Sequence, residues 1–217
     1  MNVKYLCLDI GNVICFVDEI GFLETLSYKL NISTYRAKRF LKRFQQVHDL
    51  GYTTMEDELM DQYNIKSPFI LKELVQRWND CITPDEMMLI RLNKLRADHG
   101  LQVALLSNIG VEHAQMMETK LELGGFFPGA IKHFSCHVGA RKPSMVYYQS
   151  FLLQHPEFKG CLYVDDVVDN LNASKAFGFR TFHMSLQEPW VESKIAEIEA
   201  IIVSDAAMEM TESSKCG

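Results

Sequence analysis

Several residue patterns that mark common classes of enzyme and metal protein are missing from this sequence. None of its six cysteines forms a C-x-x-C pair, and its seven histidines do not follow the spacing of zinc ligands. Three of the cysteines stand inside apolar runs, so we expect buried thiols in a reducing compartment rather than a disulfide framework. The segment around Ser107 lacks a G-x-S-x-G elbow, which argues against a serine triad. The chemistry of the chain must therefore depend on other residues.

Long apolar runs and an excess of positive charge are also missing. No segment of the 217 residues is long and apolar enough to cross a bilayer, and no basic stretch followed by an apolar one opens the chain. The net charge of −6 argues against nucleic acid or an anionic membrane as the main partner. A small anionic substrate is still compatible with it, because the local field of a site decides whether an anion binds. We expect a cytoplasmic protein that acts on a small molecule, and the sequence leaves its oligomeric state open.

Segments with the character of strands and helices alternate along most of the chain. Apolar runs near residues 3–8, 101–106, 130–135, 160–164 and 180–183 predict buried strands. The order is typical of a doubly wound, mainly parallel α/β sheet of the Rossmann-like kind. The core helices are predicted over residues 83–99, 111–123, 141–154, 169–177 and 189–203, with Gly124 and Gly125 ending the second.

One helical block interrupts this alternation between the first strand and the second. Its apolar residues recur at helical spacing in four segments, Gly21–Leu30, Thr34–His48, Thr54–Tyr63 and Pro68–Cys81. The block is longer than a crossover between parallel strands requires, so we interpret it as an inserted helical cap. The predicted organisation is a core of residues 1–17 plus 82–203, a cap of residues 18–81 and a loose polar tail of residues 204–217.

Polar side chains stand where three of the predicted strands end. The carboxyl ends of parallel strands meet at one edge of a sheet, which is where open α/β sheets bind ligands. Carboxylates at such an edge suit Mg²⁺, which takes one or two of them and leaves room for a substrate phosphate. A carboxylate can also attack phosphorus, while a serine hydroxyl and a lysine ammonium stabilise the phosphoryl group. The residues concerned are Asp9, Ser107, Asn108, Asp165 and Asp166 at strand ends, and Lys142 before a helix.

Four segments of the chain resemble motifs of the haloacid dehalogenase-like (HAD) hydrolase superfamily. They occur in the order of those motifs and, with the helical cap, cover nearly the whole chain except its tail. The branch that the chain resembles most has a small helical cap of the C1 type. It holds sugar-phosphate phosphatases and the phosphatase domain of soluble epoxide hydrolases. The matching segments are Leu8–Ile14, Leu105–Asn108, Gly139–Pro143 and Val164–Asn170.

This resemblance implies a Mg²⁺-dependent phosphatase that acts on a small phosphomonoester, such as a sugar phosphate or a nucleotide. It also implies an aspartyl-phosphate intermediate on Asp9. The metal would take one ligand from the backbone, the carbonyl of Gly11. The implied catalytic residues are Asp9, Ser107, Lys142 and Asp165; the substrate ligands are Asn12, Ser107, Asn108 and Lys142; and the metal ligands are Asp9, Gly11 and Asp166.

The chain departs from the superfamily pattern at Gly11. Most phosphatases of the superfamily place a second aspartate there, which protonates the leaving alkoxide and then activates water. Losing one general acid/base costs about 10²–10⁴-fold in rate. Asp18 is a candidate replacement, although it also fits a helix cap. Two other functions stay open: a metal-independent 2-haloacid dehalogenase, which the paired acids Asp165 and Asp166 disfavour, and a phosphate-binding protein without turnover.

The same residues also have ordinary structural explanations. Asp9 fits a turn at a strand end, and Asp165 and Asp166 fit the cap of the helix that follows them. Arg36, Lys38, Arg39, Lys42 and Arg43 lie in one predicted cap helix, where such a run usually forms a solvated face. One or two of these cations, or His48 and Tyr52, could also reach the distal group of a substrate.

Overall fold

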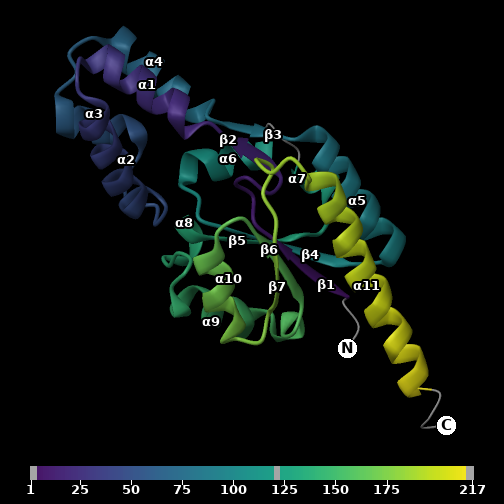
Figure 1. Ribbon diagram of the computed structural model, residues 1–217. Helices are drawn as coiled ribbons and strands as arrows, with labels where there is room; N and C mark the ends of the chain where they lie inside the picture. Colours follow the sequence, from purple (N-terminus) through teal and green to yellow (C-terminus); the bar gives the residue numbers. More distant parts are fainter. Residues whose placement is uncertain (1–3, 120–122, 214–217) are drawn as a thin grey trace.

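The computed structural model describes residues 4–119 and 123–213. Within these residues a parallel sheet with the strand order β5-β4-β1-β6-β7 forms the centre of the molecule (Figure 1). The strands are β1 (Tyr5–Leu8), β4 (Gln102–Ser107), β5 (Ile131–Phe134), β6 (Leu162–Asp165) and β7 (Arg180–His183). The predicted doubly wound α/β class is confirmed, and β1 lies in the middle of the sheet.

Helices cover both faces of the sheet, because successive residues of a strand point to opposite faces. Leu6 and Leu8 of β1 pack into one buried cluster, whereas Cys7 between them packs into the cluster of the other face. Figure 1 shows α5 and α11 on one side and α9 and α10 on the other. The core helices are α5 (Glu86–His99), α6 (Val111–Thr119), α7 (Leu123–Phe126), α8 (Ser135–Val138), α9 (Met145–Gln154), the 3₁₀ helix η1 (Pro156–Phe158), α10 (Val168–Lys175) and α11 (Val191–Ser213).

Four consecutive helices form a separate layer at one end of the molecule (Figure 1). Side-chain oxygens of Asp18, Ser33, Thr54 and Ser67 accept the backbone hydrogen bonds that start them, as N-cap residues do. Their apolar faces enclose a third buried cluster, which includes Phe22, Phe44 and Trp78. The helices are α1 (Glu19–Leu30), α2 (Thr34–His48), α3 (Met55–Tyr63) and α4 (Pro68–Asn79), within two residues of the predicted bounds.

A two-stranded antiparallel ribbon connects the helical layer to the sheet. It consists of β2 (Cys15–Val17) and β3 (Ile82–Pro84), with Phe16 opposite Thr83. Both segments were predicted differently, as a turn at residues 15–18 and as the first turn of a helix at Thr83 and Pro84. Asp85 is the N-cap that starts α5 instead, and Pro84 ends a short strand where its missing N–H is tolerated.

Two predicted helix ends are wrong. Gly124 and Gly125 lie inside α7 rather than after a helix, and residues 120–122 are outside the described residues. Packing of Phe126 and Phe127 in the core outweighs the cost of about 1 kcal/mol for each helical glycine. The last helix runs to Ser213 instead of Val203, because residues 204–213 contain no glycine or proline and are rich in Ala, Met and Glu. Residues 214–217 of the predicted tail are outside the described part.

Among the described residues, no helix combines the length and the apolarity that crossing a bilayer requires.

Candidate functional site

Polar residues from three neighbouring strands meet at the carboxyl edge of the sheet. Asp9 directly follows β1, Ser107 ends β4, and Asp165 ends β6 with Asp166 after it. β1 pairs with both other strands, so these ends lie next to one another. One carboxylate oxygen from each of Asp9, Asp165 and Asp166 lies within 4.8 Å of the others. The edge therefore concentrates negative charge at a single point.

Lys142 provides the positive charge at this point. Its Nζ donates hydrogen bonds to Leu106 O at 2.8 Å and to Asp165 Oδ2 at 2.7 Å, and lies 3.0 Å from Asp9 Oδ1. The residue is buried, and although burial lowers its pKa, the adjacent carboxylates of Asp165 and Asp9 raise it overall. Lys142 therefore carries a full charge, and all three of its protons are directed at oxygen atoms.

Four hydrogen-bond donors surround the carboxylate of Asp165. Its oxygens accept hydrogen bonds from the Val167 amide at 2.7 Å, from Asn170 Nδ2 at 3.1 Å and from the Tyr163 hydroxyl, besides the bond from Lys142. A carboxylate that already accepts this many hydrogen bonds has little capacity left for a metal. Its contacts instead fit a residue that orients Lys142. Tyr163 and Asn170 were not predicted as members of the site, although Asn170 stands in the segment that resembles the fourth motif.

Asp9 has one occupied and one open carboxylate oxygen. Oδ1 accepts the backbone hydrogen bond of Ile10 at 2.7 Å and pairs with Lys142, whereas Oδ2 has no hydrogen bond within the described part of the chain. Burial raises the pKa of Asp9 to about 7, with Lys142 acting against this shift and Asp165 and Asp166 adding to it. The positive charge of Lys142 is thus not enough to offset the cost of burying the ionised form of Asp9.

Asp166 is positioned by Asn12. The Asn12 side chain donates from Nδ2 to Asp166 Oδ2 at 3.1 Å, and its own Oδ1 accepts from Gln187 at 3.1 Å. Asn12 adopts the left-handed conformation with φ 51°, which asparagine tolerates better than most residues. Burial raises the pKa of Asp166, an effect that the Asn12 hydrogen bond opposes and Asp165 reinforces. Asn12, which was predicted as a substrate ligand, therefore orients the carboxylate of Asp166 in this structure.

Ser107 and Asn108, which were predicted together as phosphate ligands, differ in the structure. Ser107 is buried beneath the pocket described below, and within the described residues its hydroxyl has no hydrogen-bond partner. The Asn108 side chain instead accepts from the Lys142 amide at 2.8 Å and donates to the Lys142 carbonyl at 2.9 Å. Asn108 thus fixes the Lys142 backbone, which also explains why the next helix begins at Met145 rather than at the predicted Arg141.

A pocket of about 230 Å³ lies over this edge, between the sheet and the helical layer. From the core, Asp9, Ser107, Lys142 and Asp166 line it, together with Gly11 and Arg141. The helical layer contributes Glu19, Gln45 and Asp49, none of which was predicted as a site residue. Arg141 Nη2 pairs with Asp49 at 2.7 Å, while its buried Nε has no hydrogen-bond partner among the described residues. The lining therefore combines side chains of both charge signs with the aromatic ring of Trp78.

Direct contacts hold the helical layer against the core beside this pocket. His48 Nε2 lies 2.9 Å from Glu112 Oε2 of α6, and the other oxygen of Glu112 accepts the Met55 amide at 3.2 Å. Although burial opposes it, hydrogen bonds to Asp49 and Glu112 raise the pKa of His48. A side chain at Gly110 would place its Cβ only 2.0 Å from the His48 ring, so only glycine allows this close approach.

Asp18 does not have the contacts of a proton donor. Its carboxylate accepts the Gly21 amide at 2.9 Å as the N-cap of α1, and its other oxygen forms an ion pair with Arg77 of α4. The Gly21 hydrogen bond and Arg77 lower the pKa of Asp18. A general acid requires the opposite shift, because it must still hold its proton near neutral pH.

We therefore expect the substitution Asp18→Asn to leave turnover unchanged. Asparagine keeps the helix cap and loses only an ion pair that is exposed at the carboxylate, which is worth at most about 1 kcal/mol. The measurement is the pH profile of kcat/KM for phosphomonoester hydrolysis. If the variant lost the decline of kcat/KM at high pH that reports an essential protonated group, and kcat fell as well, Asp18 would be the proton donor.

Comparison with known proteins agrees with this architecture. No protein-family model matches the chain, and no curated protein matches it either. A predicted HAD-like family hydrolase from Porphyromonas gingivalis superposes with a TM-score of 0.73 at 16% identity, covering 91% of this chain and 98% of that one. A HAD-family enzyme from Bacteroides thetaiotaomicron, in complex with magnesium and inorganic phosphate, superposes with a TM-score of 0.69 at 19% identity, covering 88% and 98%.

A third solved structure is the L-2-haloacid dehalogenase from Xanthobacter autotrophicus with chloropropionic acid covalently bound. It superposes with a TM-score of 0.56 at 15% identity, covering 83% of this chain and 77% of that one. Similarities at such low identity define the fold. The chain has the fold of HAD-family enzymes, with its acidic cluster at the carboxyl edge of the sheet.

Proposed function

We propose that this protein is a Mg²⁺-dependent phosphatase that hydrolyses a small phosphomonoester. The observation that supports it best is the imbalance of charge at the sheet edge. Three carboxylates gather there around the ammonium of Lys142, the one cation that pairs with Asp9 or Asp165 among the described residues. A divalent cation would restore the balance and would stabilise the ionised form of Asp9. We further propose that residues 18–81 act as the cap over this site.

The residues at the edge fit Mg²⁺. Carboxylate and carbonyl oxygens are the ligands that this ion prefers, and it uses only one or two carboxylates. Asp9 through its open Oδ2, Asp166 and the carbonyl of Gly11 would hold it, whereas Asp165 is already occupied by protein hydrogen bonds. When bound, the ion supplies positive charge to the phosphoryl oxygens and brings them close to Asp9.

The proposed reaction has two displacements at phosphorus. In the first, a carboxylate oxygen of Asp9 bonds to phosphorus while the bond to the alkoxide breaks, and the alkoxide takes a proton. In the second, water attacks phosphorus, loses a proton and releases both phosphate and the Asp9 carboxylate. Lys142 neutralises charge on Asp9 and the phosphoryl group in both steps, and the Ser107 hydroxyl donates to a phosphoryl oxygen.

Gly11 has no side chain that could protonate the alkoxide as it departs. Glu19 and Asp49 line the same pocket, so a bound water held by them, or the substrate itself, would supply the proton. The polar side chains of Glu19, Gln45 and Asp49 beside the Trp78 ring fit a substrate with several hydroxyl groups, such as a sugar phosphate.

Restoring the carboxylate is sterically feasible and tests this point. A Cβ at Gly11 would meet only Val17 Cγ2, at 3.4 Å, which is ordinary contact. We expect Gly11→Asp to raise kcat/KM for an alkyl phosphate by about 10²-fold, because the alkoxide then receives a proton as it leaves. Nitrophenyl phosphate is the control, since its leaving group departs without a proton and kcat/KM should not rise. An equal rise for both substrates would contradict this explanation.

The function itself is tested by phosphate release from a panel of sugar phosphates and nucleotides, with Mg²⁺ and with EDTA. Turnover that requires the metal supports the proposal. Chloride release from a haloacetate without metal would instead identify a dehalogenase. Absence of turnover on the whole panel, with Mg²⁺ still bound, would identify a binding protein.

Asp166 and Ser107 should separate metal binding from phosphate binding. We expect Asp166→Asn to weaken Mg²⁺ binding by about tenfold or more, equivalent to at least about 1.4 kcal/mol. Ser107→Ala, which removes a phosphate contact and no ligand, should leave the metal affinity unchanged. Titration calorimetry with MgCl₂ measures both, and equal affinity in the two variants would contradict the assignment of Asp166 as a ligand.

A further inference from the structure

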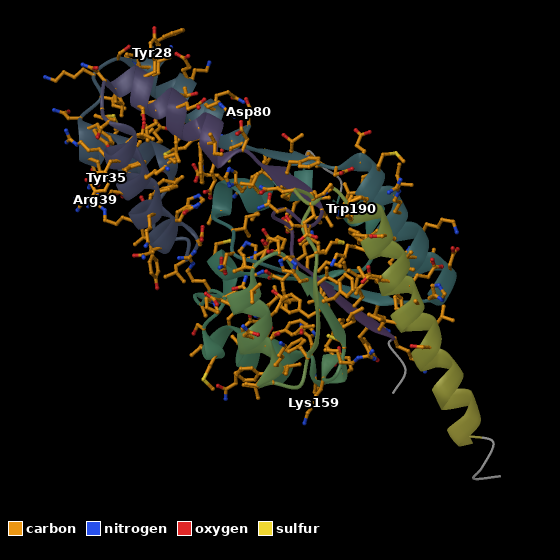
Figure 2. The ribbon with its side chains drawn as sticks, viewed as in Figure 1. Tyr28, Tyr35, Arg39, Asp80, Lys159 and Trp190 are labelled. Atoms are coloured by element: carbon orange, nitrogen blue, oxygen red, sulfur yellow. The ribbon has the colours of Figure 1, made fainter. Side chains whose placement is uncertain are left out.

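A second cavity, of about 450 Å³, lies in the helical layer between α2 and α3. It shares no lining residue with the pocket over Asp9. Figure 2 shows Arg39 and Tyr35 at the outer edge of the layer, away from the sheet. We call this cavity the α2 groove, and it is lined by Arg36, Arg39, Phe40, Lys42, Arg43, Gln46, Gln62 and Tyr63.

Four cations line the α2 groove, all from α2. Arg36, Arg39 and Arg43 follow the spacing i, i+3 and i+7, which places them on one face of the helix, and Lys42 stands beside them. All four are exposed. Arg43 lies 3.5 Å from Glu58 with 58% of its side chain exposed. The other three have no acidic partner among the residues that the structure describes.

This arrangement does not stabilise α2. Like charges at these spacings destabilise a helix by about 0.2–0.5 kcal/mol per pair. Arg36 stands in the first turn, where the helix dipole favours acidic residues, and this turn contains none. The whole chain carries a net charge of −6, so the accumulation of cations is local. The Arg43–Glu58 pair and the Arg39 guanidinium 5.9 Å from the Tyr35 ring centroid offset only part of this cost, which indicates that the cations serve binding.

The base of the α2 groove is aromatic and amphipathic. Phe40 is buried, Tyr63 is half-buried, and their ring centroids are 5.4 Å apart. Burial raises the pKa of Tyr63, and the charges of Arg36 and Arg43 act against this shift. Gln46 and Gln62 add amide donors at the rim.

We propose that the α2 groove binds a small polyanion that carries at least two phosphate groups. Guanidinium groups form paired hydrogen bonds with phosphate oxygens. The four positive charges exceed the negative charge of about −2 that a single phosphate carries. The volume of about 450 Å³ lies in the range of pockets for molecules of nucleotide size. This site is independent of hydrolysis at Asp9, so it would remain even if the proposed phosphatase activity failed.

The test uses inorganic tripolyphosphate as the probe, in titration calorimetry of the full chain with EDTA present. The variant is Arg36→Gln with Arg39→Gln, two residues without an acidic partner among the described residues. Glutamine keeps helix propensity and relieves charge repulsion, so urea unfolding should show equal or greater stability. We expect the Kd for tripolyphosphate to rise by about tenfold or more, or about 1.4 kcal/mol.

Two control variants make the result specific. Lys38→Gln with Lys72→Gln removes the same charge from exposed cap residues outside the α2 groove, and should change the Kd far less. Ser107→Ala alters the pocket over Asp9 and should leave the Kd unchanged. The proposal is overturned if wild-type protein does not bind tripolyphosphate, if both charge variants weaken binding equally, or if Ser107→Ala abolishes it.

Discussion

On the proposed function, replacing Asp9 by asparagine is expected to lower kcat for Mg²⁺-dependent phosphomonoester hydrolysis by about 10⁴-fold or more, the scale on which losing a nucleophile acts. Asparagine has nearly the same shape, and its Oδ1 still accepts the Ile10 amide. It cannot displace an alkoxide from phosphorus, because an amide oxygen carries no full negative charge. The measurement is steady-state phosphate release at saturating Mg²⁺.

The stability of Asp9→Asn should not fall. Burial raises the pKa of Asp9 to about 7, so its ionised form costs the folded protein free energy above that pH. The neutral amide removes this cost, and we expect an equal or higher free energy of unfolding in urea at pH 8. Asp169→Asn is the matched control, because Asp169 is an exposed residue of α10 and should leave turnover unchanged. Turnover that survives in Asp9→Asn would mean that another residue attacks phosphorus.

Replacing Lys142 by methionine should damage both stability and turnover. Lys142 is the one cation paired with Asp9 and Asp165 in the described structure, and all three side chains are buried. Removing one partner from a buried ion pair costs about 3–5 kcal/mol, because an uncompensated charge stays behind. Turnover should fall by about 10²–10³-fold or more, since the charge over the phosphoryl group is lost as well.

The loss of stability in Lys142→Met should depend on pH. Without the ammonium, the folded-state pKa of Asp9 rises further above its unfolded value. A carboxyl group with a raised pKa destabilises the fold at high pH, and the penalty disappears as pH falls towards the unfolded pKa. Urea unfolding should therefore show a larger loss at pH 8 than at pH 5.

Lys132→Met is the control for this prediction. Lys132 is an exposed residue of β5 that pairs with Glu118 at 3.1 Å, and losing such a pair costs at most about 1 kcal/mol. A similar, pH-independent loss in both lysine variants would contradict the proposed electrostatic role of Lys142.

The fold was predictable because each layer has its own local signal. Strands β1, β4 and β6 are apolar over most of their length, since a parallel sheet is covered on both faces. Helices α2, α3 and α4 begin directly after Ser33, Thr54 and Ser67, whose hydroxyls cap them. The β2–β3 ribbon was missed because three-residue strands pair over a long chain separation and have no periodicity of their own. Local sequence signals predict single helices and strands, but they do not predict which segments distant in the chain pair with each other.

The site could be predicted only in part, for a related reason. Topology alone brings Asp9, Ser107 and Asp165 together, because the ends of adjacent parallel strands must meet. The direction of an amide side chain has no such rule, so the hydrogen bonds of Asn108 to Lys142 and of Asn12 to Asp166 were not predictable. The role of both asparagines as substrate ligands stays a prediction. The packing of the helical layer against the core brings three further residues to the pocket, Glu19, Gln45 and Asp49.

The most direct test of the account is to trap the covalent intermediate. The protein is mixed with a ³²P-labelled phosphomonoester and Mg²⁺, quenched in acid during turnover, digested, and analysed by mass spectrometry. We predict a phosphoryl group on Asp9 that hydroxylamine removes, and no label on the Asp9→Asn variant. Label on another residue, or phosphate release without any labelled peptide, would contradict nucleophilic attack by Asp9.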